Sequence, residues 1–323
     1  MLKYRKSKAD EKSGRLRPLF LWKTVERIVM LRTFEYNVGP EEEMNIRTLL
    51  KQKYKMSTAL INKLKQSEDG ITVNGARQKV SFQLKPGDVV RLRMREEASE
   101  QIVPTPVELS ILYEDEDLVI INKPPYLPTH PSMGHFTNTL ANGLAYYWQQ
   151  KGEAYVFRAV NRLDKNTSGV MAVAKNAYAH AQLCSQIQEG QLRRKYRCIV
   201  CGAVEKDGTV DAPIGREDGS ILRRQVRQDG QQARTHYRVL ERKQGHTLLE
   251  LELETGRTHQ IRVHMAYLGY PVLGDFLYGE ETEKMPRQAL HSSYLVLTHP
   301  VTFETLSFEA PLPQDLQSFW DCL

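Results

Sequence analysis

The chain of 323 residues contains only four cysteines, Cys184, Cys198, Cys201 and Cys322. This number is too small for a disulfide framework in a chain of this length, and it favours a reducing compartment. Cys198 and Cys201 form a C-x-x-C pair, but the segment alternates like a strand, which would direct the two sulfur atoms to opposite faces. A closed zinc site would also need a second pair of ligands. We therefore expect no metal site in this protein.

Long apolar runs are also lacking. The longest, around residues 118–121 and 170–174, fall far short of the roughly 18 residues that a membrane-spanning helix needs. The basic N-terminal stretch is not followed by the apolar core of a secretory signal. We therefore expect a cytoplasmic protein that does not cross a membrane. Phosphate-binding glycine loops, nucleotide fingerprints and G-x-S-x-G elbows are absent as well, which argues against the enzyme classes that carry them.

Charge is distributed unevenly along the chain. The net charge is +6, but residues 44–95 carry twelve Lys or Arg and three acids, whereas residues 96–323 carry 23 bases and 29 acids. A short segment with this excess of positive charge is typical of a surface that meets phosphates, although a solvated face would also explain it. Our candidates for nucleic-acid contacts cluster on two short helical stretches: Lys51, Lys53, Lys55, Lys63 and Lys65.

The front third of the chain predicts a small α/β domain. Residues 1–33 are basic and lack periodicity, so we expect a disordered arm. Apolar residues recur at helical spacing over 44–54 and 57–66, and alternate like strands over 71–74 and 87–94. We assign residues 34–95 to this small domain, and residues 96–107, which are acidic and contain two prolines, to a linker.

The rest of the chain, residues 108–323, predicts a second and larger domain. It alternates strand patterns with two helices, expected over 139–150 and 176–188, and the strands follow one another like hairpins rather than in regular β-α-β order. We therefore expect an α+β fold, built on a largely antiparallel mixed sheet that helices and loops flank.

A polar loop, RLDKNTSG at residues 162–169, leads directly into an apolar strand. This arrangement presents the carboxylate of Asp164 at the rim of a sheet, where functional residues are often found. The Asp, Asn, Ser and Gly residues of the loop are also ordinary turn formers, so the loop alone does not define a site.

The segment TGRTHQIRVH, residues 255–264, follows an alternating strand as another polar turn. If that strand neighbours the first, Arg262 can reach Asp164, stabilise its charge and fix its direction. The two histidines lack the H-E-x-x-H spacing and have no acidic ligand between them, which argues against a metal site and for hydrogen-bonded structural roles.

A basic cluster, Arg193–Arg197, surrounds Tyr196 with cations. Arg194 and Lys195 are candidates for phosphate contacts, and the ring could stack on a base. The alternative is the start of a strand with a buried tyrosine.

These residues together resemble the RluA family of pseudouridine synthases. The resemblance extends from about Leu109 to Leu316 and rests on ordered motifs: DEDLVIINKP at 115–124, the RLDKNTSG loop, Lys195-Tyr196, TGRTHQIRVH, Gly274-Asp275 and Leu290-His291. The front domain resembles the S-four-like RNA-binding module that often precedes this catalytic domain, mainly in the turns at Val73-Asn74-Gly75 and Pro86-Gly87-Asp88.

The resemblance implies that the protein isomerises uridine to pseudouridine in RNA without a cofactor. By position, Asp164 matches the essential aspartate, acting either as a nucleophile or as the base that removes the ribose 2′ proton. Tyr196 would stack on the flipped uracil and assist the late deprotonation at carbon-5, Arg262 would pair with Asp164, and Arg162 would fill the gap that the extruded base leaves. Asn161 departs from the family, which commonly has His there; this affects local hydrogen bonding and leaves the aspartate in place.

The expected partner is RNA, with large-subunit ribosomal RNA favoured and transfer RNA left open, and we expect a monomer. Two rival functions remain at this stage. A non-catalytic RNA-binding or ribosome-assembly factor on the same fold would not depend on Asp164, and a uracil-excising glycosylase would release free uracil.

Overall fold

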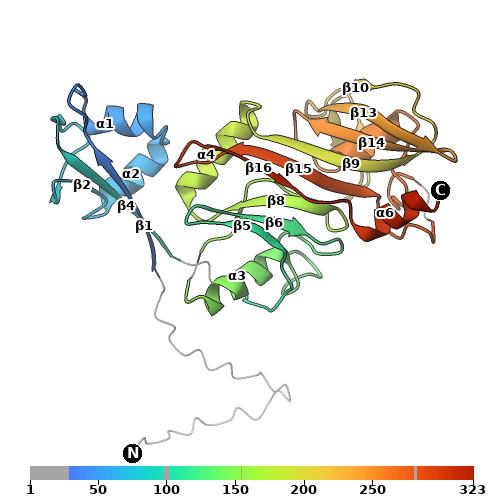
Figure 1. Ribbon diagram of the computed structural model, residues 1–323, viewed down its shortest axis with the longest axis horizontal. Helices are drawn as coiled ribbons and strands as arrows, with labels where there is room; N and C mark the ends of the chain where they lie inside the picture. The colour runs from blue at the N-terminus through green and yellow to red at the C-terminus, as the bar shows by residue number, and fades with distance from the viewer. Residues whose placement is uncertain (1–28, 98–101, 154, 280–281) are drawn as a thin grey trace, which may run out of the picture.

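The computed structural model describes residues 29–97, 102–153, 155–279 and 282–323. Figure 1 shows two lobes, a small one coloured blue to teal and a large one built on a long sheet. The small lobe, or front domain, is an antiparallel sheet in the order β1-β4-β2-β3 with helical segments packed against it. Its elements are β1 (Val29–Asn37), α1 (Ile46–Thr48), the π-helical η1 (Leu49–Lys53), α2 (Thr58–Gln66), β2 (Ile71–Val73), β3 (Ala76–Arg77) and β4 (Val89–Glu97).

Two predictions for the front domain need correction. Residues 29–33, which we assigned to the basic arm, belong to β1 and pair with β4 along its whole length. Their basic residue Arg32 is neutralised by carboxylates that lie more than eighty positions away, which local sequence cannot reveal. The single helix expected over 44–54 is interrupted, because Tyr54 N–H bonds to the carbonyl of Leu49 in a wider π turn. The part of the arm that spans residues 1–28 lies outside the described residues.

The front domain is docked on the large domain through specific contacts. Arg32 donates to both carboxylate oxygens of Asp117, at 2.9 and 2.8 Å. Glu96 accepts from the backbone N–H of Ala177, at the start of a helix of the large domain. Tyr178, from the same helix, is fully buried in the hydrophobic core of the front domain, with its ring 5.1 Å from that of Phe34. The core of the front domain is thus completed by a side chain of the other domain.

The expected linker is partly structured. Glu96 and Glu97 end β4, while residues 98–101 lie outside the described part of the chain. From residue 102 onward the segment packs on the large domain: Asn142 donates its side-chain N–H to the carbonyl of Val103 at 2.8 Å, and Ile102 and Val107 contact the core.

The large domain has a ten-stranded sheet with the main order β10-β13-β14-β9-β15-β8-β6-β5. Neighbouring strands are antiparallel except β8 and β15, so the expected α+β fold with a mixed, largely antiparallel sheet is confirmed. Its strands are β5 (Ile111–Glu114), β6 (Leu118–Lys123), β7 (Arg158–Ala159), β8 (Ser168–Ala174), β9 (Arg193–Cys201), β10 (Gly208–Asp211), β13 (Arg234–Lys243), β14 (His246–Leu253), β15 (Leu290–Thr298) and β16 (Thr305–Glu309), and a separate hairpin joins β11 (Ile214–Arg216) to β12 (Arg224–Val226).

Both faces of this sheet are covered, which explains why its central strands are apolar throughout. In β6 the side chains of Val119 and Ile121 join one core cluster with α3 (Leu140–Gln150), whereas Leu118 and Ile120 join another with α4 (Ala177–Gln188). Both helices match the sequence prediction, and their caps are Thr139 and Asn176. The helix α6 (Gln314–Asp321) adds Leu316 and Trp320 to the first cluster.

The segment 255–264 differs from the prediction of a polar turn alone. The turn ends at His259, and residues from Gln260 onward form the helix α5 (Gln260–Tyr267), so Arg262 lies on a helix. In the described part of the chain, no helix combines the length and apolar character that crossing a bilayer requires.

Candidate active site

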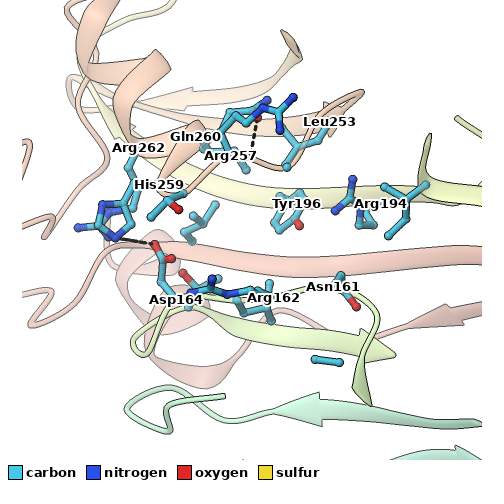
Figure 2. Close-up of a pocket in the computed structure, with 18 of the residues that line it drawn as sticks. Asn161, Arg162, Asp164, Arg194, Tyr196, Leu253, Arg257, His259, Gln260 and Arg262 are labelled. Carbon is cyan, nitrogen blue, oxygen red and sulfur yellow. Dashed lines mark hydrogen bonds and ion pairs between the residues drawn. The ribbon is translucent and has the colours of Figure 1, made fainter. Parts of the chain in front are cut away.

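A cavity of about 390 Å³ lies between the loop before β8, strand β9 and the start of α5. Figure 2 shows the side chains that line it: Asp164 and Arg162 on one side, Tyr196 and Arg194 on β9, and His259 and Arg262 at the start of α5. The RLDKNTSG loop and the TGRTHQIRVH segment, 86 or more residues apart in the sequence, thus form opposite walls of one cavity.

The backbone of the loop that carries Asp164 is held by two buried basic side chains, Lys123 and Arg287. Lys123 donates to the carbonyl of Lys165 at 3.0 Å, and Arg287 donates to the carbonyl of Asn166 at 3.0 Å. Burial lowers the pKa of Lys123 to about 7. Arg287 is fully buried and is itself held by Asp315 at the start of α6. The loop backbone is therefore anchored, and the Asp164 side chain remains 28% exposed at the cavity wall.

The end of this loop depends on a glycine. Gly169 has φ +115, and a Cβ there would collide with the backbone of Ser292 on β15. Only glycine allows β8 and β15 to approach this closely. The Gly169 of the motif therefore serves the parallel pairing that places the loop at the edge of the cavity.

Arg262 joins two carboxylates. Its Nη1 lies 2.9 Å from Oδ2 of Asp164, while Nε and Nη2 donate to the two oxygens of Asp275 at 2.6 and 2.7 Å. Asp275 is fully buried, and Arg262 is 3% exposed. Burial alone would lower the pKa of Arg262, but the hydrogen bonds and charges of the two carboxylates outweigh it and raise that pKa well above its ordinary value. The ion pair expected between Arg262 and Asp164 is present.

His259 lies on the other side of Asp164, with Nε2 at 3.8 Å from Oδ2. The hydroxyl of Tyr278 accepts from the N–H of Arg224 and lies 2.8 Å from Nδ1 of His259, so it can donate its own proton to Nδ1 in one tautomer of the ring. In that tautomer the proton of a neutral His259 is on Nε2 and faces Asp164. Burial lowers the pKa of His259, although Asp164 opposes this. His259 also has φ +59, an uncommon backbone conformation for a residue with a side chain.

Strand β9 divides the basic cluster between its two faces. Arg194 and Tyr196 are buried and line the cavity, whereas Lys195 and Arg197 lie on the opposite face and pair with Glu250. Full burial raises the pKa of Tyr196, although the charge of Arg194 opposes the shift. The structure therefore brings Arg194 to the cavity and places Lys195 away from it.

The remaining predicted residues occupy two places. Arg162 lines the cavity as an exposed side chain. All five candidate lysines are exposed on the front domain; Lys53 is ion-paired with Glu42 and contacts Tyr36, and Lys51 donates to the hydroxyl of Thr58 at 2.9 Å. Asn161 is buried beside the cavity; its Oδ1 accepts from Ala172 N–H at 2.9 Å.

Two residues of the site were not among our candidates, Asp275 and His259. Asp275 belongs to the Gly274-Asp275 motif, so the resemblance contained the signal but not the role. His259 is in the predicted polar turn, where we expected histidines in structural roles. Their contribution depends on contacts with Arg262 and Asp164, which sequence spacing does not determine.

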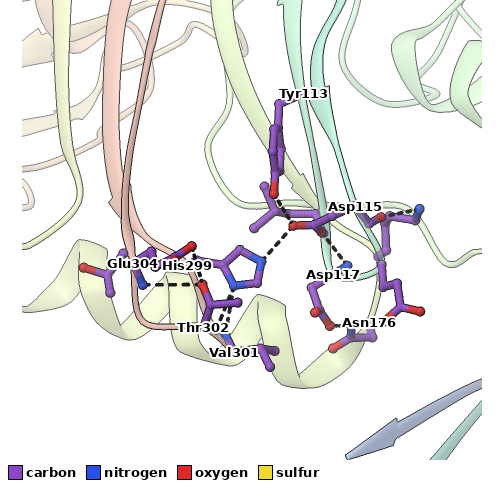
Figure 3. Close-up of polar contacts among 12 residues, drawn as sticks. Tyr113, Asp115, Asp117, Asn176, His299, Val301, Thr302 and Glu304 are labelled. Atoms are coloured by element: carbon purple, nitrogen blue, oxygen red, sulfur yellow. Dashed lines mark hydrogen bonds and ion pairs between the residues drawn. The ribbon is translucent and has the colours of Figure 1, made fainter.

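A second cluster of polar side chains, Asp115, Asp117 and His299, has the ligand types of a metal site (Figure 3). However, both oxygens of Asp115 accept hydrogen bonds, from Tyr113, His299 and two backbone N–H groups. Both oxygens of Asp117 accept from Arg32, and one also from Asn176. Burial alone would raise the pKa of Asp115, yet these donors lower it well below its usual range. The cluster is a satisfied structural network that supports the start of α4.

The cavity therefore offers a carboxylate at its wall, a guanidinium that fixes it and an aromatic ring on the opposite strand. Such a set can serve nucleophilic or general-base chemistry on a flat, uncharged ring.

Comparison with known proteins agrees with this chemistry. A family model described as RNA pseudouridylate synthase matches residues 117–267. The uncharacterised RNA pseudouridine synthase YjbO of Bacillus subtilis is 45% identical over 263 residues, which cover 81% of this chain and 93% of that protein. Ribosomal large subunit pseudouridine synthase D of Pseudomonas aeruginosa is 41% identical, with coverage of 77% and 82%. Among solved structures, human RNA pseudouridylate synthase domain containing 4 matches with a TM-score of 0.54 and 26% identity, covering 66% of this chain and 92% of that one.

Proposed function

Since the chain belongs to the RNA pseudouridylate synthase family, we propose that it modifies specific uridines in the ribosomal RNA of the large subunit. Membership makes the protein an isomerase that converts uridine to pseudouridine in RNA. The ribosomal substrate is supported by relatives at 38–45% identity that are named ribosomal large subunit pseudouridine synthase D. A cytoplasmic location and a monomeric enzyme are part of the same proposal.

The observation that carries the proposal is the position of Asp164 on the cavity wall, held by Arg262 and facing a cavity that Tyr196 also lines. In the reaction the bond between N1 and C1′ breaks, the uracil turns, C5 bonds to C1′, a proton leaves C5 and N1 gains one. Asp164 acts either by attacking the nucleotide or by removing the 2′ proton, and both routes use a carboxylate of fixed direction. No step requires a cofactor.

Arg262 and Tyr196 complete the proposed machinery. Arg262 directs Asp164 through one hydrogen bond and is itself locked by Asp275. Tyr196, 4% exposed, offers one ring face to a base in the cavity, and burial raises the pKa of its hydroxyl. The base must leave its stack to enter, and exposed Arg162 at the cavity edge is suited to occupy the space it vacates.

We further propose that the front domain is an S-four-like RNA-docking module. Its exposed lysines, Lys51, Lys55, Lys63 and Lys65, would supply phosphate contacts that bring the RNA to the cavity without reading its sequence.

The test uses Asp164→Asn, which keeps the shape of the side chain and removes its charge. Large-subunit ribosomal RNA labelled with tritium at C5 of uridine is incubated with each protein. We expect tritium release with the wild type, none with the variant, and RNA binding within about twofold in both. A wild-type protein that releases no tritium supports a non-catalytic factor, and free uracil among the products supports a glycosylase. Tritium release from transfer RNA alone identifies transfer RNA, rather than ribosomal RNA, as the substrate.

A map of pseudouridines in total RNA, with and without the protein, then identifies the sites. Loss of pseudouridine confined to large-subunit ribosomal RNA is the expected result. Rescue by the wild type but not by Asp164→Asn shows that the chemistry, rather than binding, restores the modification.

A further inference from the structure

Of the arginines that line the cavity in the described part of the chain, two are buried: Arg262, which is paired with carboxylates, and Arg194, which is not. Arg194 is 5% exposed, and its guanidinium forms no hydrogen bond or ion pair with any described residue. Its Nε is buried and has no acceptor. An unpaired charge held away from water is costly, so proteins rarely bury a guanidinium without a carboxylate beside it. The missing negative charge is therefore expected from a ligand.

Nearby acids are committed elsewhere. Glu250, paired to β9, faces the other side of the sheet, where it binds Lys195, Arg197 and Arg238. At the opposite end of the cavity, Asp164 and Asp275 share Arg262, so two carboxylates there surround one guanidinium. The two ends of the cavity thus differ in charge: the Asp164 end is negative and the Arg194 end is positive.

The surroundings of Arg194 leave room for an anion, and a second unpartnered donor belongs to a residue of the same lining. Gly256 lies over the guanidinium: a Cβ there would be 3.4 Å from Nη1, so a larger residue would begin to cover it. Asn161 lines the same end, and its buried Nδ2 has no acceptor, because only its Oδ1 is engaged. Figure 2 shows Arg194 and Asn161 on the same side of Tyr196, away from Asp164. Arg194 and Asn161 therefore each keep a buried donor that has no partner among the described residues.

We propose that Arg194, supported by Asn161, binds a phosphodiester of the RNA strand next to the nucleotide whose base enters the cavity. The inference rests on the proposed function and adds a subsite to it. A uracil carbonyl would satisfy a donor but would leave the positive charge uncompensated, whereas a phosphate compensates it and matches the forked guanidinium. Arg194 and Tyr196 are two residues apart on one strand face, about 6.5 Å, so the ring can take a base while the guanidinium takes the backbone.

The experiment measures binding, independently of catalysis, in the Asp164→Asn background. The probe is the large-subunit ribosomal RNA hairpin that binds most tightly, made with a single uncharged methylphosphonate at each linkage in turn. With Arg194 present, one linkage should weaken binding by about tenfold when it loses its charge. With Arg194→Met, that linkage should have no further effect, and Arg194→Lys should restore part of the loss. Lys195→Met, on the other face of the same strand, is the matched control and should leave the sensitive linkage sensitive.

Stability supplies a second readout. Because Arg194 has no partner within the described protein, RNA-free Arg194→Met should melt at the wild-type temperature or above it. A substantially lower melting temperature, or the same linkage sensitivity in Arg194→Met as in the parent, would overturn the proposal. A wild-type protein that shows the coupling but forms no pseudouridine would overturn the proposed function and leave the phosphate subsite standing.

Discussion

Arg262 contacts Asp164 through a single nitrogen, because its other two are held by Asp275. The guanidinium therefore cannot rotate to follow the Asp164 side chain. If Asp164 turns away from Arg262, its carboxylate loses this hydrogen bond. A fixed partner orients Asp164 before the substrate arrives, which reduces the reorganisation that the reaction requires.

Asp275→Asn should weaken the orientation of Asp164 by Arg262 without altering any group that meets the substrate. The amide keeps one acceptor but loses the charge, so Arg262 is held less firmly and turns toward Asp164. We expect kcat to fall about 10- to 100-fold with KM changed much less, since misplacement of a catalytic group by about 1 Å has an effect of this size.

The control for Asp275→Asn is Asp69→Asn, which removes a carboxylate that pairs with Arg93 and Arg95 in the front domain. It should leave kcat unchanged. A normal kcat in Asp275→Asn would mean that Asp164 needs no oriented partner.

Stability should depend on pH through His291. Its Nδ1 accepts from Ser168 at 2.9 Å and its Nε2 donates to the carbonyl of Ala310, so the neutral ring is satisfied; burial lowers its pKa to about 4. The unfolded chain binds the proton with a pKa of about 6.5. Stability from His291 is thus complete above pH 6.5 and is lost as the pH falls to about 4, by at most about 3 kcal/mol.

Urea unfolding at pH 7 and pH 5 measures this loss. His291→Gln cannot titrate, and its free energy of unfolding should change less between the two pH values than that of the wild type. An equal change in both proteins would show that other groups cause the acid sensitivity.

Replacement of Lys51, Lys55, Lys63 and Lys65 with Gln should weaken RNA binding and flatten its dependence on salt. Each lysine that contacts a phosphate adds about 0.7 to the slope of log K against log salt for a single-stranded RNA. The expected decrease is therefore up to about 2.8, measured by titration between low and physiological salt. Lys53→Gln should lower the slope by less than a single Gln substitution at any of those four lysines, because Lys53 is already ion-paired with Glu42 and in contact with Tyr36. An unchanged slope would contradict the docking role of the front domain.

Arg32→Gln should loosen the contact between the two domains. Asp117 is 3% exposed and would lose two hydrogen bonds from a charged donor, which costs about 1 to 3 kcal/mol. Hydrogen exchange at β1 and at the first turn of α4 should accelerate. The matched variant Arg91→Gln removes an ion pair with Glu35 on the same sheet, where both partners are about half exposed, and should change exchange little. Equal protection in Arg32→Gln and wild type would show that apolar contacts alone hold the domains together.

Local patterns predicted the helices α3 and α4 and the strands β6, β8, β9 and β14 well, because caps and hydrophobic periodicity are properties of neighbouring residues. The resemblance located Asp164, Tyr196 and Arg262, and the structure brings all three to one cavity. Features that depend on distant pairing were missed. The strand β1 begins within the basic segment that looked unstructured, and the partners of its Arg32, Glu116 and Asp117, are remote in sequence. The role of Asp275 became visible only through its contact with Arg262. Strand alternation separates Arg194 from Lys195, but only the packing of β9 in the sheet shows that Arg194 is the one that faces the cavity.

The burial of Tyr178 in the front domain has a consequence for synthesis of the chain. The ribosome releases β1 to β4 first, so Phe34 and the residues around it leave the exit tunnel before the tyrosine that covers them exists. The core of the nascent front domain stays incomplete, with an exposed apolar face, until α4 has been translated. Completion of this core is then coupled to the folding of the large domain. A protein truncated between the two domains would expose an apolar, aggregation-prone surface instead of forming a complete front domain.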